Sequence, residues 1–264
     1  MIGFCPLASG SKGNLLYFGS KKTKILIDAG LSMKATQLRL AEIGVDLSEI
    51  EAILITHDHS DHIKGLNSLI NKTGIPIFCN SETAKGICDE LGIKPKFKIF
   101  STGESFEFGD LEIHPFSVQH DTVDPVGFTI KLDTIKVGIC ADLGFVTSLV
   151  KHQLKSCDYL YVEANHEPNM VHACSRPPIY KQRVLGRQGH LSNGDCAQLV
   201  LDVFHADLKH VYLAHLSSEC NHPELALKIV REKLSKEGKE LSISVAHQDK
   251  VSLFTSFEKA ALMA

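Results

Sequence analysis

The pattern of hydrophobic and polar positions in the first part of the chain predicts alternating strands and helices. Apolar runs at residues 24–28, 50–55 and 75–78 indicate buried strands, and residues 33–43 and 83–91 have the spacing of amphipathic helices. Strands and helices that alternate in this way form sheets with helices packed against them. We therefore expect an α/β architecture from the start of the chain.

The pattern changes to β-hairpins in the middle of the chain and returns to alternation after it. Residues 104–113 alternate across Gly109-Asp110, and residues 126–140 do so across Asp133-Thr134, as hairpins do. Further strands are expected at 157–163, 209–214 and 241–247, and further helices at 192–205 and 223–236. No repeat or linker interrupts this order, so we predict one domain over residues 1–264, with two sheets packed face to face and helices outside.

The composition is that of an ordinary soluble globular protein, with 44% hydrophobic and 22% charged residues. The formal net charge of −3 argues against a generally basic nucleic-acid-binding surface, but not against a local basic patch. No apolar run reaches the roughly 18 residues of a membrane span, and the N-terminus lacks the pattern of a secretory signal. The eight cysteines form no C-x-x-C pair, which indicates reduced thiols and a cytoplasmic protein.

One stretch concentrates side chains that bind metals. Residues 57–62 have the order His-Asp-His-Ser-Asp-His and lie between a predicted strand and a predicted helix. In an extended chain His57 and His59 face the same way, whereas Asp61 and His62 begin the helix and can face a second point. Imidazole and carboxylate groups are ligands for zinc, manganese or iron(II). The alternative is a polar loop with a chance cluster of histidines, which explains this order less well.

Three later residues follow apolar strands in the same manner, namely His120, Asp142 and His215. Each of them alone is consistent with an ordinary polar residue near a strand end. Together with the first cluster they supply the ligand contacts that a dinuclear site needs, because loops after strands bring such positions together. Asp28 also ends a strand, and we expect it to support a neighbouring loop rather than to bind metal.

The H-x-H-x-D-H string within residues 54–62 resembles the signature of the metallo-β-lactamase-fold hydrolases. The resemblance implies a four-layer αββα sandwich of two mixed sheets, and two divalent metal ions per chain, Zn²⁺ first and Mn²⁺ as the alternative. It assigns His57, His59 and His120 to the first metal, Asp61, His62 and His215 to the second, and Asp142 to a bridge between them. An aspartate at the bridging position resembles the phosphodiesterases and thioesterases of this superfamily and differs from the zinc β-lactamases.

Three further strings narrow the resemblance to the YycJ/WalJ-type branch, which is DNA exonuclease-like. They are Glu-Ala-Asn-His at 163–166, Gly-His-Leu-Ser-Asn at 189–193 and Ala-His-Leu-Ser-Ser-Glu-Cys-Asn at 214–221. The small residues at 9–14 resemble the opening of this branch, so we expect them to border the site rather than only form a hairpin turn. The resemblance extends from residue 7 to about residue 251 and leaves no room for the β-CASP insertion of RNase J-type nucleases.

The expected chemistry is hydrolysis of a phosphodiester by a metal-bound hydroxide. Similarity to the tRNase Z-type enzymes implies that His190 protonates the leaving alkoxide and that Glu163 orients it. Asp61 is counted among the catalytic residues as well as the ligands. His190 could also be a helix-start residue without a role, and His166 is equally consistent with a substrate contact and with a structural loop residue.

No acidic residue occurs in residues 168–194, although the chain as a whole is slightly acidic. The span contains four basic side chains, Arg176, Lys181, Arg183 and Arg187. They indicate contacts with a nucleic-acid backbone, and the alternative is a solvated surface loop.

We therefore predict a metal-dependent hydrolase, a phosphodiesterase and exonuclease acting on DNA, with nucleic acid and no membrane as its partner. The alternatives of the same fold are a glyoxalase II-like thioesterase, a hydrolase of a small cyclic phosphodiester and an RNA-processing nuclease. An alternative of another class is a non-catalytic metal sensor, which the presence of both His190 and Glu163 disfavours. The sequence makes no prediction of the oligomeric state.

Overall fold

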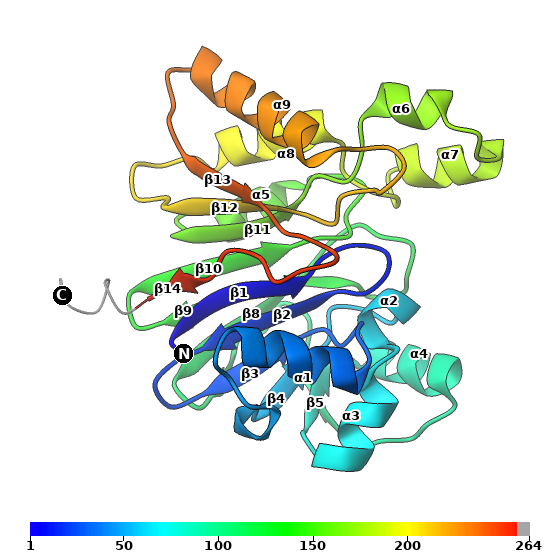
Figure 1. The fold of residues 1–264 in the computed structure, drawn as a ribbon, viewed down its shortest axis with the longest axis vertical. Coiled ribbons are helices and arrows are strands. Elements are labelled where there is room, and N and C mark those ends of the chain that lie inside the picture. Colours follow the sequence, from blue (N-terminus) through cyan, green and yellow to red (C-terminus); the bar gives the residue numbers. More distant parts are fainter. Residues whose placement is uncertain (258–264) are drawn as a thin grey trace.

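The computed structural model describes residues 1–257, which form two seven-stranded sheets that pack face to face (Figure 1). The first sheet has the order β14 (Thr255–Ser256), β1 (Gly3–Ala8), β2 (Leu15–Gly19), β3 (Lys24–Ile27), β4 (Ala52–Leu54), β5 (Ile77–Cys79), β6 (Phe97–Ile99). The second has the order β13 (Ser242–Val245), β12 (His210–Ala214), β11 (Tyr159–Glu163), β10 (Ile135–Cys140), β9 (Val126–Leu132), β8 (Leu111–Ser117), β7 (Phe106–Phe108).

Both sheets are mixed, and both are mixed in the same way. In the first sheet β14, β1, β2 and β3 pair antiparallel, and β3 to β6 pair in parallel. In the second, β7 to β10 pair antiparallel, and β10 to β13 pair in parallel. The carboxyl ends of parallel strands meet at one edge of a sheet, which is where open α/β sheets bind their ligands. This arrangement brings loops from both halves of the chain to one place.

Three hydrophobic layers hold the four structural layers together. Aromatic and branched side chains from both sheets, such as Phe4, Phe128 and Tyr212, fill the space between them. On the outer face of the first sheet lie α1 (Met33–Glu42), α3 (Leu66–Thr73) and α4 (Ser81–Leu91), and on that of the second lie α5 (Ser148–Leu154), α8 (Asn193–Asp202) and α9 (Pro223–Lys236) (Figure 1). The predicted αββα sandwich is therefore confirmed. Among the described residues, no helix is both long and apolar enough to cross a bilayer.

The helix predicted after the histidine-rich stretch is in fact two helices. A short α2 (Ser60–Ile63) ends before Gly65, and α3 begins after it. The Gly65 nitrogen donates to the Ala29 oxygen at 2.8 Å, and a Cβ at position 65 would lie 1.9 Å from the Leu31 oxygen. Only a glycine permits this close approach, so the contact with the loop after β3 interrupts the helix.

The sequence pattern missed five elements, namely the 3₁₀ helix η1 (Leu47–Glu49), α5, β14, α6 (Pro168–Ala173) and α7 (Pro178–Leu185). Each of α6 and α7 has a proline in its first turn and buries a single residue, Val171 or Val184. One buried side chain in a helix leaves no apolar periodicity to detect, and β14 is only two residues long. In Figure 1 α6 and α7 project away from the sandwich.

Candidate metal centre

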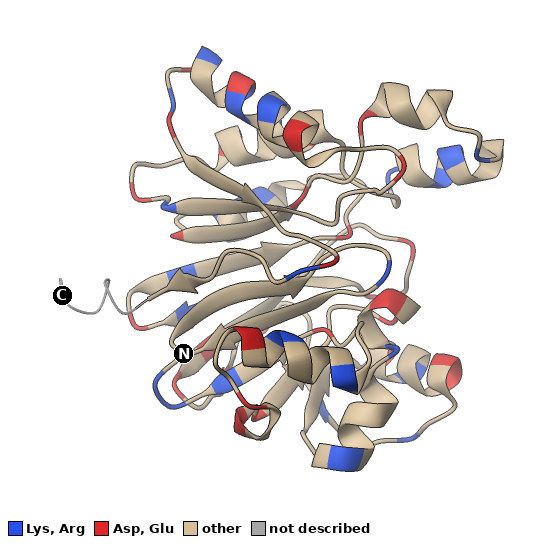
Figure 2. Cartoon of the chain, in the orientation of Figure 1, with Lys and Arg blue, Asp and Glu red and all other residues tan. Residues whose placement is uncertain are grey.

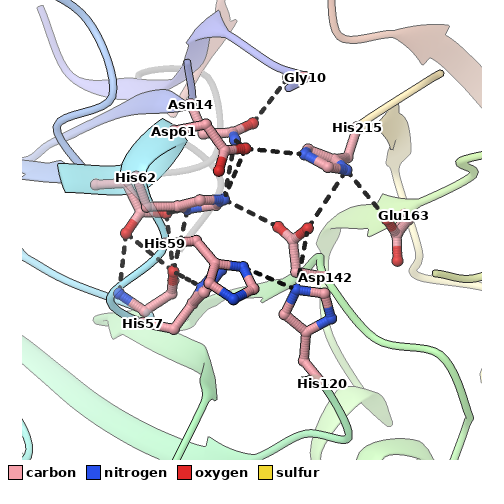
Figure 3. A network of polar contacts seen from close by, with 12 residues as sticks. Gly10, Asn14, His57, His59, Asp61, His62, His120, Asp142, Glu163 and His215 are labelled. Carbon is pink, nitrogen blue, oxygen red and sulfur yellow. Dashed lines mark hydrogen bonds and ion pairs between the residues drawn. The ribbon is translucent and has the colours of Figure 1, made fainter. Parts of the chain in front are cut away.

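Side chains from both sheets converge at the carboxyl ends of the strands (Figure 3). The stretch after β4, His120 after β8, Asp142 after β10 and His215 after β12 all reach this point. All seven predicted ligands take part in groups whose possible ligand atoms lie within 4.8 Å of one another, namely His57, His59 and His120, then Asp61, His62 and His215, then His57, His62 and Asp142. A fourth group of this kind joins Asp142 and His215 to Glu163 and His190. Five of the seven are buried, and His59 and Asp61 are partly exposed.

The backbone is unusual where it presents these side chains. Asp28, Asp142 and His215 have φ values of 63°, 54° and 53°, which are left-handed conformations that a non-glycine residue rarely adopts. Each of the three directly follows a strand or lies within two residues of its end. A conformation of this kind costs on the order of 1–3 kcal/mol and persists where the surrounding structure enforces it. Its repetition here indicates that these loops are shaped to aim side chains at one point.

Two polar atoms at the centre are buried without a hydrogen bond, His57 Nε2 and Asp142 Oδ2. The second lies 3.1 Å from His62 Nε2, and Nδ1 of His59 lies 3.2 Å from Nε2 of His120. Leaving a buried polar group unsatisfied costs about 1–3 kcal/mol. Lone-pair donors that face one another in this way fit cations between them, so the residues present suit a metal site.

The electrostatics of the centre also favour cations. Burial lowers the pKa of His57 and of His120, which keeps both imidazoles neutral and able to donate a lone pair. Burial acts in the same direction on His62 and His215, but the surrounding carboxylates outweigh it and raise the pKa of both. The carboxylates therefore hold protons at these two imidazoles. A metal ion that binds them displaces those protons.

A second set of residues holds the candidate ligands in place. Asp28 Oδ2 lies 2.7 Å from Nδ1 of His62, and Oδ1 of the same carboxylate accepts from the backbone nitrogen of Thr56 at 2.9 Å. The Asn14 side-chain nitrogen lies 3.1 Å from Asp61 Oδ2 and 2.9 Å from His62 Nε2, so the loop at 9–14 does border the centre. The sequence predicted that Asp28 supports a neighbouring loop. It did not predict the contacts of Asn14, and the only sign of them was the position of Asn14 in that glycine-rich loop.

Glu163 joins His190 to the centre. The carboxylate is completely buried, and its Oε1 lies 2.8 Å from Nδ1 of His190 and 3.2 Å from Nδ1 of His215. Its Oε2 accepts hydrogen bonds from the backbone nitrogens of Leu143 at 2.9 Å and Leu191 at 3.1 Å. Burial alone would raise the pKa of Glu163, but the two histidines outweigh it and hold the pKa at about 2. The carboxylate is therefore ionised and fixes both imidazoles.

The remaining predicted residues lie around the centre. His166 is buried, its backbone oxygen accepts from Asn193 at 2.9 Å, and its Nδ1 makes no hydrogen bond. The basic span forms α6 and α7, and Figure 2 shows no acidic residue on either helix.

The fold nevertheless brings carboxylates to two of the four basic residues. Arg176 pairs with Glu219, and Arg183 pairs with Asp121, which is adjacent to His120. Lys181 donates to a backbone oxygen at 2.7 Å, and Arg187 lies over the ring of Phe145. The net positive charge of this region is therefore smaller than its sequence suggests, because carboxylates from distant parts of the sequence pair with two of its arginines.

Two open hollows border the centre, and their charges differ. One of about 920 Å³ lies beside His59 and Asp61, and its lining also includes five further carboxylates and two basic side chains, namely Asp58, Glu82, Asp89, Glu90, Asp121, Lys85 and Arg183. The other, of about 390 Å³, lies between α7 and the loop before His190, and its lining includes Arg183 and Arg187. The centre therefore has an acidic side and a more basic side.

Comparison with known proteins agrees with this geometry. Residues 23–215 match the family model described as the beta-lactamase superfamily domain. The chain is 38% identical over 240 residues to exodeoxyribonuclease YycJ of Bacillus anthracis, covering 90% of each chain. It is 37% identical over 231 residues to exodeoxyribonuclease WalJ of Streptococcus pneumoniae, covering 85% of this chain and 86% of that one. The crystal structure of the metallo-beta-lactamase fold protein YhfI from Bacillus subtilis matches with a TM-score of 0.71 at 16% identity, covering 94% of this chain and 98% of that one.

Proposed function

This chain is a hydrolase of the metallo-β-lactamase superfamily and belongs with the YycJ and WalJ proteins, and on that premise we propose that it is an exonuclease that hydrolyses phosphodiester bonds of DNA with two divalent metal ions. The observation that carries the proposal is the junction of a cation-binding centre with the Glu163–His190 pair. The names of the relatives at 37–38% identity support the choice of DNA.

In this proposal the seven clustered side chains hold the metals. His57, His59 and His120 hold one ion, Asp61, His62 and His215 hold the other, and Asp142 lies between the two sets. His57 Nε2, which is buried without a hydrogen bond, and Asp142 Oδ2, which has only the imidazole of His62 beside it, support this assignment. Zn²⁺ fits the imidazole-rich set best, and Mn²⁺ is the alternative. Two such ions supply Lewis-acid polarisation of a phosphoryl oxygen and activation of water at neutral pH.

The role of the Glu163–His190 pair follows from its geometry. The ionised carboxylate accepts Nδ1–H of His190 and so leaves Nε2 as the ring atom that presents a proton. An alkoxide that leaves phosphorus needs a proton, and a positioned imidazolium can donate it. Because Glu163 Oε1 also lies 3.2 Å from His215, the same carboxylate sets the donor's position relative to a metal ligand. We assign His190 as the general acid and Glu163 as the residue that positions it.

The charges around the centre favour one direction of approach for a polyanion. The hollow beside His59 has six carboxylates against two basic side chains, Lys85 and Arg183, and so disfavours phosphates, whereas α7 carries basic side chains and no acidic ones (Figure 2). The strand therefore crosses the α7 side, where the four basic residues of the span contact its backbone. Two of them, Arg176 and Arg183, exchange a carboxylate partner for phosphate when they do so. The backbone oxygen of His166 holds the loop at Asn193, and its Nδ1, which makes no hydrogen bond, leaves the predicted substrate contact as the alternative role of this residue.

An activity panel tests the proposal. The metal-loaded protein is incubated with end-labelled duplex DNA, single-stranded DNA, RNA and S-lactoylglutathione, beside Asp142→Asn and His152→Asn variants. We expect stepwise shortening of DNA from an end, its loss in Asp142→Asn, and unchanged activity in His152→Asn, whose side chain is exposed on α5. Hydrolysis of the thioester without any cleavage of nucleic acid, or shortening of RNA alone, contradicts the proposal.

A further inference from the structure

An exposed aromatic ring stacks with an arginine at the edge of the centre. The Arg187 guanidinium carbon lies 4.0 Å from the centroid of the Phe145 ring. Phe145 is 40% exposed, which makes it the most exposed phenylalanine in residues 1–257. Unlike Arg176 and Arg183, Arg187 pairs with no carboxylate among these residues. A single exposed ring or an unpaired surface guanidinium is ordinary by itself, and the feature that calls for an explanation is their stacking on each other beside the centre.

The stack is built from the two loops that also present Asp142 and His190. Phe145 follows Asp142 by three residues, and Arg187 precedes His190 by three residues. The loops touch at Gly144, where a Cβ would lie 2.5 Å from the Gly189 nitrogen and 2.6 Å from the Gly186 oxygen.

Two anchors fix this pair of loops to the centre. Glu163 Oε2 accepts the backbone N–H groups of Leu143 and Leu191, one from each loop. The Gly144 nitrogen also donates to the Gln119 oxygen at 2.8 Å, beside His120. The position of the stack is therefore determined by the same carboxylate that positions His190.

The surroundings of the stack suit a flat heterocycle with polar edges. Arg187 lines the hollow of about 390 Å³, and Phe145 stacks on Arg187 without lining the hollow itself. The rest of the lining consists of two exposed amide side chains, Gln182 and Gln188, of Gly186 and Gly189, and of the paired Arg183 and Asp121. Aromatic rings and guanidinium planes stack on nucleobases, and amide groups pair with their edges. A simple phosphate contact would use Arg187 but gives no reason for the exposed ring of Phe145.

We propose that Phe145 and Arg187 form a stacking subsite for one unpaired nucleobase, in the nucleotide next to the bond that is cleaved, on the His190 side of the centre. The inference rests on the proposed nuclease function and refines its substrate. A base can stack there only after it leaves its neighbour in the strand, so the subsite selects a terminal or single-stranded nucleotide. In this proposal Phe145 contacts the base and positions the substrate. Arg187 contacts the same base in addition to a backbone phosphate.

The first test measures binding without cleavage. The 5′- and 3′-monophosphates of 2-aminopurine deoxyriboside are titrated into the metal-loaded protein, and fluorescence quenching reports stacking. Deoxyribose phosphates without a base serve as calorimetric probes. We expect Phe145→Ala to weaken nucleotide binding by about 10- to 100-fold. Binding of the base-free phosphates stays unchanged, Phe145→Tyr restores binding, and Leu149→Ala, an exposed side chain on α5, has no effect.

The second test measures cleavage of DNA whose terminal nucleotide carries a base or is abasic. The parent protein should prefer the base-bearing end in kcat/KM, mainly through KM, and Phe145→Ala should remove the preference. If the parent cleaves DNA but Phe145→Ala keeps both the preference and the quenching, the subsite is wrong and the nuclease function stands. If Phe145→Leu equals the parent, the ring acts only as apolar bulk and the stacking proposal is overturned. If the parent neither cleaves DNA nor binds the nucleotides, both proposals fail.

Discussion

The carboxylate of Asp28 lies 2.7 Å from Nδ1 of His62, while Nε2 of the same imidazole lies 3.1 Å from Asp142. Asp28 therefore keeps one proton on Nδ1, so that Nε2 points its lone pair into the centre once a metal ion displaces the other proton. Carboxylates placed behind a histidine in this way also raise its basicity as a ligand. Asp28 follows β3 and His62 belongs to the stretch after β4, and these two strands are parallel neighbours in the first sheet.

Replacing Asp28 by asparagine should weaken metal binding by about 10- to 100-fold, because the amide cannot accept the imidazole proton as strongly as a carboxylate does. The affinity is measured by competition with a chromophoric chelator, and the metal content by elemental analysis. Asp207→Asn, an exposed carboxylate after α8, is the matched control and should bind like the parent. Equal affinities for Asp28→Asn and the parent would show that the contact of Asp28 with His62 does not contribute to metal binding.

Replacing His190 by asparagine should leave both metals bound and lower the rate of DNA hydrolysis by about 10²- to 10⁴-fold. A proton donor contributes only in the transition state, so the loss appears in kcat and not in binding. A nitrophenyl phosphodiester, whose leaving group needs little protonation, should be affected much less.

His205→Asn serves as the control for this experiment, because its Nε2 lies 3.0 Å from a backbone oxygen away from the centre. Equal losses of rate on both substrates would mean that His190 holds phosphate instead of donating a proton. Loss of metal in His190→Asn would make His190 a ligand. The metal content is therefore measured as well, because Nδ1 of His190 lies 3.5 Å from Asp142 Oδ1.

The ion pair between Arg176 and Glu219 predicts a gain of DNA affinity from the loss of a negative charge. Glu219→Gln frees the guanidinium for a phosphate, so binding should tighten at low salt, and the slope of log K against log salt should steepen by about 0.7–0.9. Fluorescence anisotropy with single-stranded DNA over a range of salt measures both quantities.

The double variant with Arg176→Gln separates this mechanism from a general change of surface charge. It should return the slope to that of the parent or below. Glu112→Gln disrupts a comparable exposed pair with Lys131 on β8 and β9 and should leave binding unchanged. If Glu219→Gln and Glu112→Gln have the same effect, Arg176 does not contact DNA.

The sequence predicted that the candidate ligands converge, because strand ends can be recognised from the local pattern of apolar residues. His120, Asp142 and His215 each follow a buried strand, and the fold then has little freedom in where it places them. The pairing of Arg176 with Glu219 and of Arg183 with Asp121 joins residues 43 and 62 positions apart, and no local pattern reports such contacts.

The same limit applies to α6 and α7 and to the stack of Phe145 on Arg187. These features depend on how one loop packs on another, as at Gly144. Local periodicity carries no information about that packing. The extent of a single domain over all 264 residues without a β-CASP insertion stays a prediction.

His210 predicts how stability depends on pH away from the centre. It is buried at the start of β12, where its Nδ1 and Nε2 each lie 2.8 Å from a serine hydroxyl of β13, Ser242 and Ser244. Burial lowers its pKa from 6.5 to about 4. Between these two values the unfolded chain binds a proton that the folded chain does not, so the free energy of unfolding falls as the pH falls from about 6.5 to about 4. Above 6.5 the group is neutral in both states and contributes no pH dependence.

Replacing His210 by glutamine, which cannot be protonated, should remove this part of the pH dependence. The shift from 6.5 to about 4 corresponds to at most about 3.5 kcal/mol, because each pKa unit is worth about 1.4 kcal/mol. Urea unfolding at several pH values between 4 and 7, with chelator present so that metal release does not contribute, measures the free energy of unfolding of both proteins. The variant should be the less stable protein at pH 7, and its deficit should shrink as the pH falls. His222→Gln, at the N-cap of α9, is the control. Parallel curves for His210→Gln and the parent would show that His210 does not stay neutral in the folded protein.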